Sequence, residues 1–203
     1  MSIKKVVKYG EPSLRGVTKE VHKVSKKIKE LVDDMLDTMY AQNGVGLAAP
    51  QIGEDYRIFV IDVSTGNQPL NPIVFINPKI IKKSGAVISR EGCLSFPEAF
   101  TDVKRYANVM IKALDKNGRS FVMEAKDGTL LARAIQHEYD HLNGVLFIDH
   151  AINRFDAEEE LKKNNLPPVE IDRIIDEPEL SEQINILLKE KVKSDKENCE
   201  KEK

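Results

Sequence analysis

The chain has few of the features that mark secreted or membrane proteins. It contains only two cysteines among its 203 residues, which is too few for a disulfide scaffold. No run of about 18 apolar residues occurs. The basic N-terminus, MSIKKVVKYGEPSLRG, also lacks the apolar core of a signal peptide. These absences predict a cytoplasmic protein without a membrane-spanning segment.

A strong net charge is missing as well. The 31 basic and 33 acidic residues give a formal net charge of −2, with a pI near 6.1. Such a balance creates no field that would draw the molecule to nucleic acid or to an anionic membrane. We therefore expect no direct nucleic-acid specificity and no membrane binding.

The length and the 41% hydrophobic content predict one compact catalytic domain, over residues 1–150. Residues 151–203 differ in composition, with 15 acidic and 10 basic side chains and several prolines. We expect a charged, partly helical extension there, with a helix near Ser181–Lys191 and a disordered end from about Ser194. Cys199 lies in that end and is expected to be an exposed thiol without a role.

Helices are expected on both sides of a central group of strands. Residues 25–43 place apolar side chains three and four apart, which predicts a core-facing helix that stops at Gly44. The segment GVGLAAPQIG that follows is rich in glycine and indicates a loop or an extended segment. β-branched and aromatic residues predict strands at 56–63 and 73–76, and a hairpin over 108–124 turning at Asn117-Gly118. A second helix, capped by Asp127 or Thr129, is expected to carry QHEYDH.

The residues His137, Glu138 and His141 form an HExxH motif. Histidines four apart on a helix project from one face, so both imidazoles can reach a single ion. Glu138 lies beside that face, where its carboxylate can touch a water molecule on the metal without being a ligand. Because two histidines leave a catalytic metal short of the usual three protein ligands, a third ligand is needed.

Four positions can be weighed as the third ligand. Metzincin proteases supply a histidine at the position that Phe147 occupies here, so that interpretation fails. His150 follows the expected helix end and is interpreted as a surface histidine, and His22 lies among lysines and is expected to be solvated. Cys93 follows a glycine and offers a thiolate, which binds zinc or ferrous iron strongly. A lone cysteine is more often a small buried apolar residue, and composition does not decide between the two.

Three segments form a pattern along the chain: Gly44 to Gln51 (GVGLAAPQ), Glu91 to Ser95 (EGCLS) and Gln136 to Leu142 (QHEYDHL). Together they resemble the peptide deformylases, because they match the GxGxAAxQ, EGCLS and QHExDHL signatures of that family in order. The resemblance covers roughly residues 4–149. It implies an α+β fold in which antiparallel or mixed sheets wrap around a central HExxH helix, with an N-terminal helix and a C-terminal helical extension. One departure from the family pattern is Phe100, which stands where family members often have an arginine. This difference concerns how the rim of the expected substrate pocket contacts the substrate backbone.

The implied activity is metal-dependent hydrolysis of the N-formyl group on the initiator methionine of nascent polypeptides, with release of formate. Cys93, His137 and His141 are then the metal ligands, and Glu138 is the general base and later the general acid. The resemblance further implies that the Gln51 amide and the Leu94 backbone N–H donate hydrogen bonds to the formyl oxygen.

Substrate contacts follow from the same resemblance. Gly46 is expected to accept a hydrogen bond from the formamide N–H, and an apolar slot for the methionine side chain is expected from Val45, Leu130 and Ala134. Glu91 and Asp140 are expected either to orient an imidazole or to pair with an arginine such as Arg133 or Arg105. These residues sit next to the expected ligands, so structural salt bridges are an equal alternative.

The ligand set suits one divalent metal ion, Zn²⁺ and Fe²⁺ alike; Fe²⁺ is the ion expected in the cell, with Zn²⁺, Ni²⁺ or Co²⁺ as substitutes. We expect a monomer that acts on formyl-Met peptides and contacts the ribosome transiently. An HExxH endopeptidase would need a downstream ligand that the sequence lacks. A non-catalytic binding module would be expected to lack at least one of the residues named above.

Overall fold

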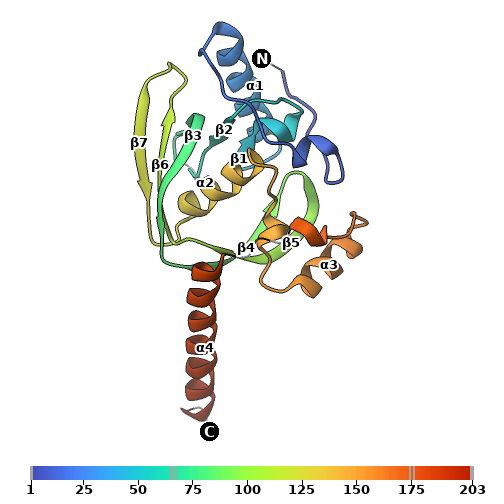
Figure 1. Ribbon diagram of the computed structural model, residues 1–203, viewed down its shortest axis with the longest axis vertical. Helices are drawn as coiled ribbons and strands as arrows, with labels where there is room; N and C mark the ends of the chain where they lie inside the picture. Colours follow the sequence, from blue (N-terminus) through green and yellow to red (C-terminus); the bar gives the residue numbers. More distant parts are fainter. Residues whose placement is uncertain (1, 65, 67, 174, 176, 202–203) are drawn as a thin grey trace.

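The chain folds into two antiparallel sheets and several helices (Figure 1). The computed structural model describes residues 2–64, 66, 68–173, 175 and 177–201, without the side chains of 171 and 190–201. The α-helices are α1 (Lys26–Ala41), α2 (Leu130–His141), α3 (Arg154–Lys163) and α4 (Pro178–Lys201). Short 3-10 turns are η1 (Pro12–Arg15), η2 (Ala49–Ile52), η3 (Phe147–His150) and η4 (Ile171–Arg173).

The strands fill the middle of the chain. They are β1 (Gly46–Ala48), β2 (Ile58–Ile61), β3 (Ile73–Ser84), β4 (Val87–Cys93), β5 (Phe96–Arg105), β6 (Asn108–Leu114) and β7 (Ser120–Ala125). Five of them form one sheet in the order β1-β2-β3-β6-β7, and β4 pairs with β5 in a second sheet. All of these named pairs are antiparallel.

Strand β2 has helices on both sides. Ile58 and Val60 belong to the apolar cluster formed with α1, while Phe59 and Ile61 belong to the cluster formed with α2. Successive side chains of a strand point to opposite faces, so a strand with a helix on each side has to be apolar throughout. Figure 1 shows α2 between the five-stranded sheet and the β4–β5 pair, which confirms the expected α+β arrangement around the HExxH helix.

The ends of both predicted helices are set by their neighbours. Ser25 caps α1 by accepting a hydrogen bond from the Ile28 N–H. The left-handed residue after α1 is Asn43, with φ of 54°, rather than Gly44, whose N–H bonds to the Met39 carbonyl. Thr129 caps α2, so of the two candidate caps Asp127 is not used.

The predicted strands differ from the observed ones in length, and two observed strands, β4 and β5, were not predicted. β2 is shorter than the range 56–63, whereas β3 continues past Ile76 through a register shift that accommodates Pro78. The segment GVGLAAPQIG divides into the short strand β1 and the turn η2. The hairpin turn at Asn117-Gly118 is confirmed, since Gly118 has φ of 79° and donates to the Asp115 carbonyl.

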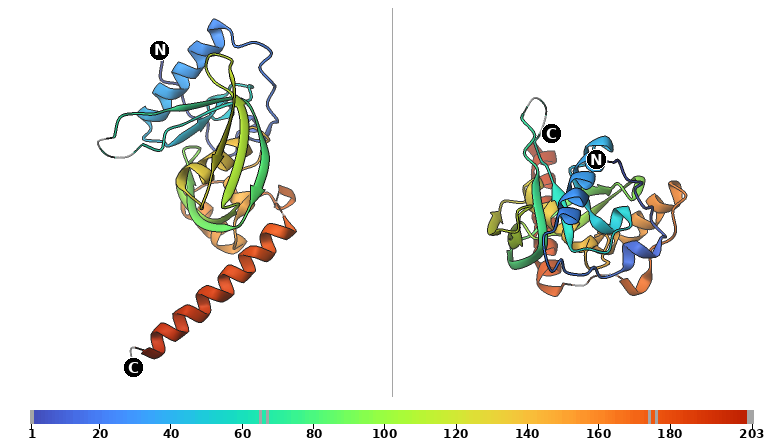
Figure 2. Two further views of the ribbon diagram at one scale, coloured as in Figure 1. Left: turned by 90° about the vertical axis from the view of Figure 1, so that its left-hand side faces the viewer. Right: turned by 90° about the horizontal axis from the view of Figure 1, so that it is seen from above.

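The C-terminal segment contributes to the core and then leaves it. Leu180 and Ile184 of α4 are buried in the cluster around α2, and Ala157 and Leu161 of α3 are buried against β5 and η3. Figure 2 shows the rest of α4 projecting away from the body. The helix is longer at both ends than Ser181–Lys191. The Cys199 side chain lies outside the described residues, and the expected disordered end stays a prediction.

No helix among the described residues is long and apolar enough to cross a membrane.

Candidate metal centre

Cys93, His137 and His141 come together at one point. The two histidines lie one turn apart on α2, with ring centroids 5.1 Å apart, and Cys93 is the last residue of β4. One potential ligand atom from each residue lies within 4.8 Å of the others, and Cys93 Sγ is 3.3 Å from His141 Nε2. Of the two interpretations left open for Cys93, its position favours the metal ligand over a buried apolar residue.

The backbone around Cys93 explains its direction. The register of the β4–β5 pair shifts between Gly92 and Cys93, which is the signature of a bulge that re-aims a side chain. The ring of Phe100 lies over Gly92, and a Cβ at that glycine would collide with it. With Phe100 in this position, the residue before Cys93 has room for glycine only.

The donor set fits a divalent metal ion. Around one tetrahedral zinc ion, sulfur and nitrogen ligands stand roughly 3.3 to 3.8 Å apart, which is compatible with the observed cluster. Glu91 Oε2 lies 3.0 Å from His137 Nδ1, and this contact leaves Nε2 for a metal. Burial, together with His137, lowers the pKa of His141 well below its ordinary value. Burial lowers the pKa of His137 as well, but hydrogen bonds to Cys93 and Glu91 outweigh it and raise that pKa well above its ordinary value. A metal ion would replace the proton at His137, because ligands bind metals in their deprotonated form.

Glu138 lies beside the three candidate ligands and has no anchoring partner for one oxygen. It is 4% exposed, and its Oε2 has no hydrogen-bond partner among the described residues. Burial raises the pKa of Glu138 to about 7. The carboxylate lies against Gly46 in β1, where any Cβ would collide with it. A carboxyl group with this pKa can both accept and release a proton near neutral pH.

Gln51 and Leu94 line the same site. The Gln51 amide nitrogen lies 3.3 Å from Cys93 Sγ and 3.4 Å from Ser95 Oγ, while its oxygen accepts from the Ala48 N–H at 2.8 Å. This last bond fixes the orientation of the amide, so its N–H groups face the cysteine. Leu94 follows Cys93 and its carbonyl accepts from Lys8.

A cavity of about 530 Å³ opens over the site, a volume typical of small-ligand pockets. Its lining includes the four residues that were expected to contact substrate: Val45, Gly46, Leu130 and Ala134. Ala134 is buried, whereas Val45 and Leu130 are partly open to solvent. Phe100, Arg90 and Arg133 also line the cavity. Neither arginine belongs to a sequence motif that would have predicted its place in the lining of this cavity.

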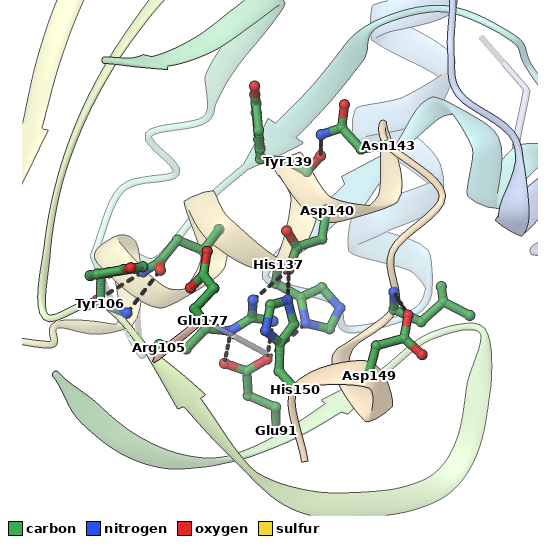
Figure 3. A network of polar contacts seen from close by, with 12 residues as sticks. Glu91, Arg105, Tyr106, His137, Tyr139, Asp140, Asn143, Asp149, His150 and Glu177 are labelled. Carbon is green, nitrogen blue, oxygen red and sulfur yellow. Dashed lines mark hydrogen bonds and ion pairs between the residues drawn. The ribbon is translucent and has the colours of Figure 1, made fainter. Parts of the chain in front are cut away.

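Behind the histidines, one arginine joins two carboxylates (Figure 3). Arg105 is 2% exposed and donates to both oxygens of Glu91 at 3.0 and 2.8 Å and to Asp140 Oδ2 at 2.5 Å. Burial alone would raise the pKa of Glu91, but Arg105 and His137 outweigh it and hold this pKa far below its ordinary value. Of the two candidate arginines, Arg105 is the partner, because Arg133 donates to the Gly128 carbonyl instead.

The interpretation of His150 as a surface histidine is wrong. The turn η3 carries it behind α2, where it is 7% exposed and its Nε2 lies 3.0 Å from Asp140 Oδ2. Its position in the sequence gave no signal, since the contact depends on how the chain turns after Gly144. His22, in contrast, is exposed as expected.

Comparisons with known proteins agree with this geometry. The sequence model of the polypeptide deformylase family matches residues 3–157. Peptide deformylase 1 of Clostridium acetobutylicum is 50% identical over 149 residues, which are 73% of this chain and 95% of the relative. Peptide deformylase 1 of Clostridium perfringens is 53% identical over 139 residues, 68% of this chain and 91% of that protein.

Solved structures show the same fold. A peptide deformylase from Synechococcus elongatus, in complex with actinonin, has a TM-score of 0.77 at 38% identity and covers 85% of this chain and 91% of its own. The peptide deformylase from Thermotoga maritima has a TM-score of 0.70 at 38% identity, covering 75% of this chain and all of its own. The chain therefore belongs to the peptide deformylase family, metal-dependent hydrolases that remove the N-formyl group from nascent polypeptides.

Proposed function

We propose that Cys93, His137 and His141 hold one divalent metal ion and that Glu138 moves the protons of the deformylation reaction. The observation that carries this proposal is the placement of three ligand atoms within 4.8 Å of one another beside a buried carboxyl group. In such a site a divalent ion polarises a carbonyl oxygen and lowers the pKa of a bound water molecule to roughly 7.

Glu138 takes a proton from the water that adds to the formyl carbon. The C–N bond then breaks, formate leaves, and Glu138 returns the proton to the amine nitrogen of methionine. A side chain that first accepts a proton and then donates it works best when its pKa is close to the working pH. The raised pKa of Glu138, about 7, supports this double role.

Gln51 and the Leu94 backbone N–H are proposed to stabilise the negative charge that develops on the formyl oxygen. The Gln51 amide is 1% exposed and oriented by its bond to Ala48, so it is in place before substrate arrives. Donors of this kind are commonly worth about 2.7 to 4 kcal/mol in the transition state.

The substrate backbone is proposed to lie along the edge of β4. Among the described strands β4 pairs with β5 only, and residues 90–93 of β4 line the cavity. An open strand edge offers N–H and C=O groups to an extended peptide. Gly46 lines the same cavity and is proposed to accept a hydrogen bond from the formamide N–H, and Val45, Leu130 and Ala134 are proposed to surround the methionine side chain.

The finer assignments are also proposals. Fe²⁺ is the proposed ion in the cell. Thiolate and imidazole ligands suit Fe²⁺ and Zn²⁺ alike, so availability decides between them, and Zn²⁺, Ni²⁺ or Co²⁺ would substitute. We further propose that the protein works as a cytoplasmic monomer and that any ribosome contact is transient. Residues 151–203 carry more acidic than basic side chains, which disfavours a contact between this segment and ribosomal RNA.

A formate-release assay on formyl-Met-Ala-Ser, with anaerobically purified protein and metal analysis of the same sample, tests the proposal. We expect turnover with about one metal ion per chain, no cleavage of casein, and competition by actinonin, which the Synechococcus elongatus relative binds. The Cys93→Ser variant should retain far less metal, because a hydroxyl is a much poorer ligand than a thiolate. Unchanged metal content in that variant would eliminate the three-ligand site.

A further inference from the structure

His150 occupies a buried position that the reaction as proposed does not use. Its ring lies behind α2, with Nε2 3.0 Å from Asp140 Oδ2, and neither ring nitrogen has an aligned hydrogen-bond partner among the described residues. Asp140 cannot donate when ionised, so the nitrogen that faces it must carry hydrogen. The contact is therefore an electrostatic one from an imidazole N–H to a buried carboxylate.

From Asp140 a continuous chain of contacts leads to a metal ligand (Figure 3). Asp140 Oδ2 accepts from Arg105 Nη1, Arg105 donates twice to Glu91, and Glu91 Oε2 lies 3.0 Å from His137 Nδ1. Glu91, Arg105 and Asp140 are largely buried, with side chains 8%, 2% and 18% exposed. Solvent can therefore replace a lost partner only poorly within this chain.

The polar contacts of the Asp140 side chain, among the described residues, come from Arg105 and His150 alone. Removing one partner of a buried carboxylate leaves it partly unsatisfied, and it then moves or draws in water. Arg105 shares that carboxylate with His150 and would follow it, which changes the angle at which it clamps Glu91. Glu91 in turn sets the orientation of the His137 ring, and partners of this type commonly change metal affinity 10- to 100-fold.

We propose that His150 is a positioning residue of the metal centre, which holds Asp140 in place and through Arg105 and Glu91 fixes the ring of His137. This inference rests on the proposed ligand set. His150 also borders a second cavity of about 560 Å³, on the side of α2 away from the active site. A different side chain at position 150 can extend into that space, so substitutions there should be compatible with folding.

Metal release from the Zn²⁺-loaded enzyme to an excess of chelator tests the proposal. His150→Leu, which removes the N–H donor, should release zinc faster than the wild type by up to about 10-fold, the lower end of the effect of residues that contact a ligand directly. His150→Gln, which keeps an N–H donor, should restore most of the retention, and His22→Leu, at an exposed histidine, should release zinc at the wild-type rate. Equal release from His150→Leu and the wild type would overturn the inference.

A double-mutant cycle separates positioning from general loosening of the fold. Glu91→Gln interrupts the chain next to His137, so adding His150→Leu to it should accelerate zinc release by less than 2-fold more. If the two effects multiply, His150 acts by another route and the inference is wrong. The wild type alone offers a further test, because nitrogen-15 NMR of the zinc enzyme should find hydrogen on Nε2 of His150; hydrogen on Nδ1 only would contradict the contact.

These outcomes are distinguishable from failure of the proposed function. Wild-type protein that binds one metal ion and releases formate supports the ligand set whatever His150 does. Wild-type protein that binds no metal would remove the ligand set and the inference together.

Discussion

Burial and pairing give different properties to the three acidic residues around His137 and His141. Glu91 and Asp140 share Arg105, and the pKa of each lies far below its ordinary value because this guanidinium, with a histidine in each case, outweighs the effect of burial. Glu138 is buried as well, but its Oε2 has no hydrogen-bond partner among the described residues, and burial raises its pKa to about 7. Two carboxylates therefore stay ionised as fixed supports, and the third is able to exchange a proton.

This difference predicts the behaviour of Glu138→Gln. The amide keeps the shape of the side chain but cannot take a proton, so kcat should fall by about 10²- to 10⁴-fold, the usual contribution of a general base. The metal content should stay at the wild-type level, because Glu138 is not among the three candidate ligands. Formate release and elemental analysis on the same preparation measure both quantities.

Glu98→Gln provides the matched control for Glu138→Gln. Glu98 also lines the cavity, but it is exposed and lies on the rim. Its variant should keep kcat within a few fold of the wild type. Wild-type kcat in Glu138→Gln would remove this residue from the mechanism, and an equal loss in both variants would point to the charge of the cavity rather than to proton transfer.

At the level of elements, the sequence predicts best where periodicity is strong. The helices α1 and α2 were predicted because their apolar residues recur at helical spacing, and Thr129 was one of the two expected caps of α2. Strands β4 and β5 were not predicted. β4 carries charged residues and a glycine, and its pairing depends on β5 and on the ring of Phe100 rather than on a local pattern. The pairing that places Cys93 near α2 is a long-range contact.

The candidate site was predictable to the extent that it resides in short motifs. The three candidate ligands, Glu138 and Gln51 are each part of a local signature, and all of them lie together in the structure. Arg105 and His150 belong to no such signature. They reach the back of α2 because of the β5 register and of the turn η3, and only tertiary structure determines both.

Asp62 connects elements near β2 and predicts how stability depends on pH. Its carboxylate accepts from the Tyr40 hydroxyl of α1 at 2.7 Å, from Ser64 at 2.6 and 2.9 Å and from the Asn71 N–H at 3.0 Å. Burial raises the pKa of Asp62, but these hydrogen bonds outweigh it and the pKa lies below its ordinary value. A lowered folded-state pKa stabilises the fold above the unfolded value of about 3.9, and that contribution is lost as the pH falls through the folded-state pKa.

Asp62→Asn should therefore destabilise the apoprotein by on the order of 1 to 3 kcal/mol at pH 7. The difference from the wild type should shrink below about pH 4, where protonation removes the advantage of the wild-type carboxylate. Urea unfolding at pH 7 and pH 3 measures both values. Asp37→Asn, at a partly exposed position of α1, should cost less than about 0.5 kcal/mol at pH 7. A difference that grows as the pH falls would contradict the assignment.

At the scale of the whole molecule, the C-terminal segment completes two parts of the core. The family match ends at residue 157, yet Leu161 and Val169 lie in the cluster around β5, and Leu180 and Ile184 lie in the cluster around α2. Burial of these apolar side chains stabilises the catalytic domain only if the side chains become exposed to water when that domain unfolds. The part of α4 that contacts the body is thus expected to unfold together with the catalytic domain.

Two isoleucines of α4 make this expectation testable. Ile184 is 3% exposed and lies in the core cluster, whereas Ile186, two residues further along the same helix, is 51% exposed. Ile184→Ala should lower the free energy of unfolding by about 2 to 5 kcal/mol, because it removes buried methyl groups and leaves a cavity. Ile186→Ala deletes the same atoms from a position open to solvent and should change the free energy of unfolding by less than about 1 kcal/mol.

Urea unfolding followed by loss of deformylase activity and by circular dichroism should give one shared transition for both variants. If Ile184→Ala instead melts α4 in a separate early transition and leaves the midpoint of activity loss unchanged, α4 is an independent appendage and not part of the folded core.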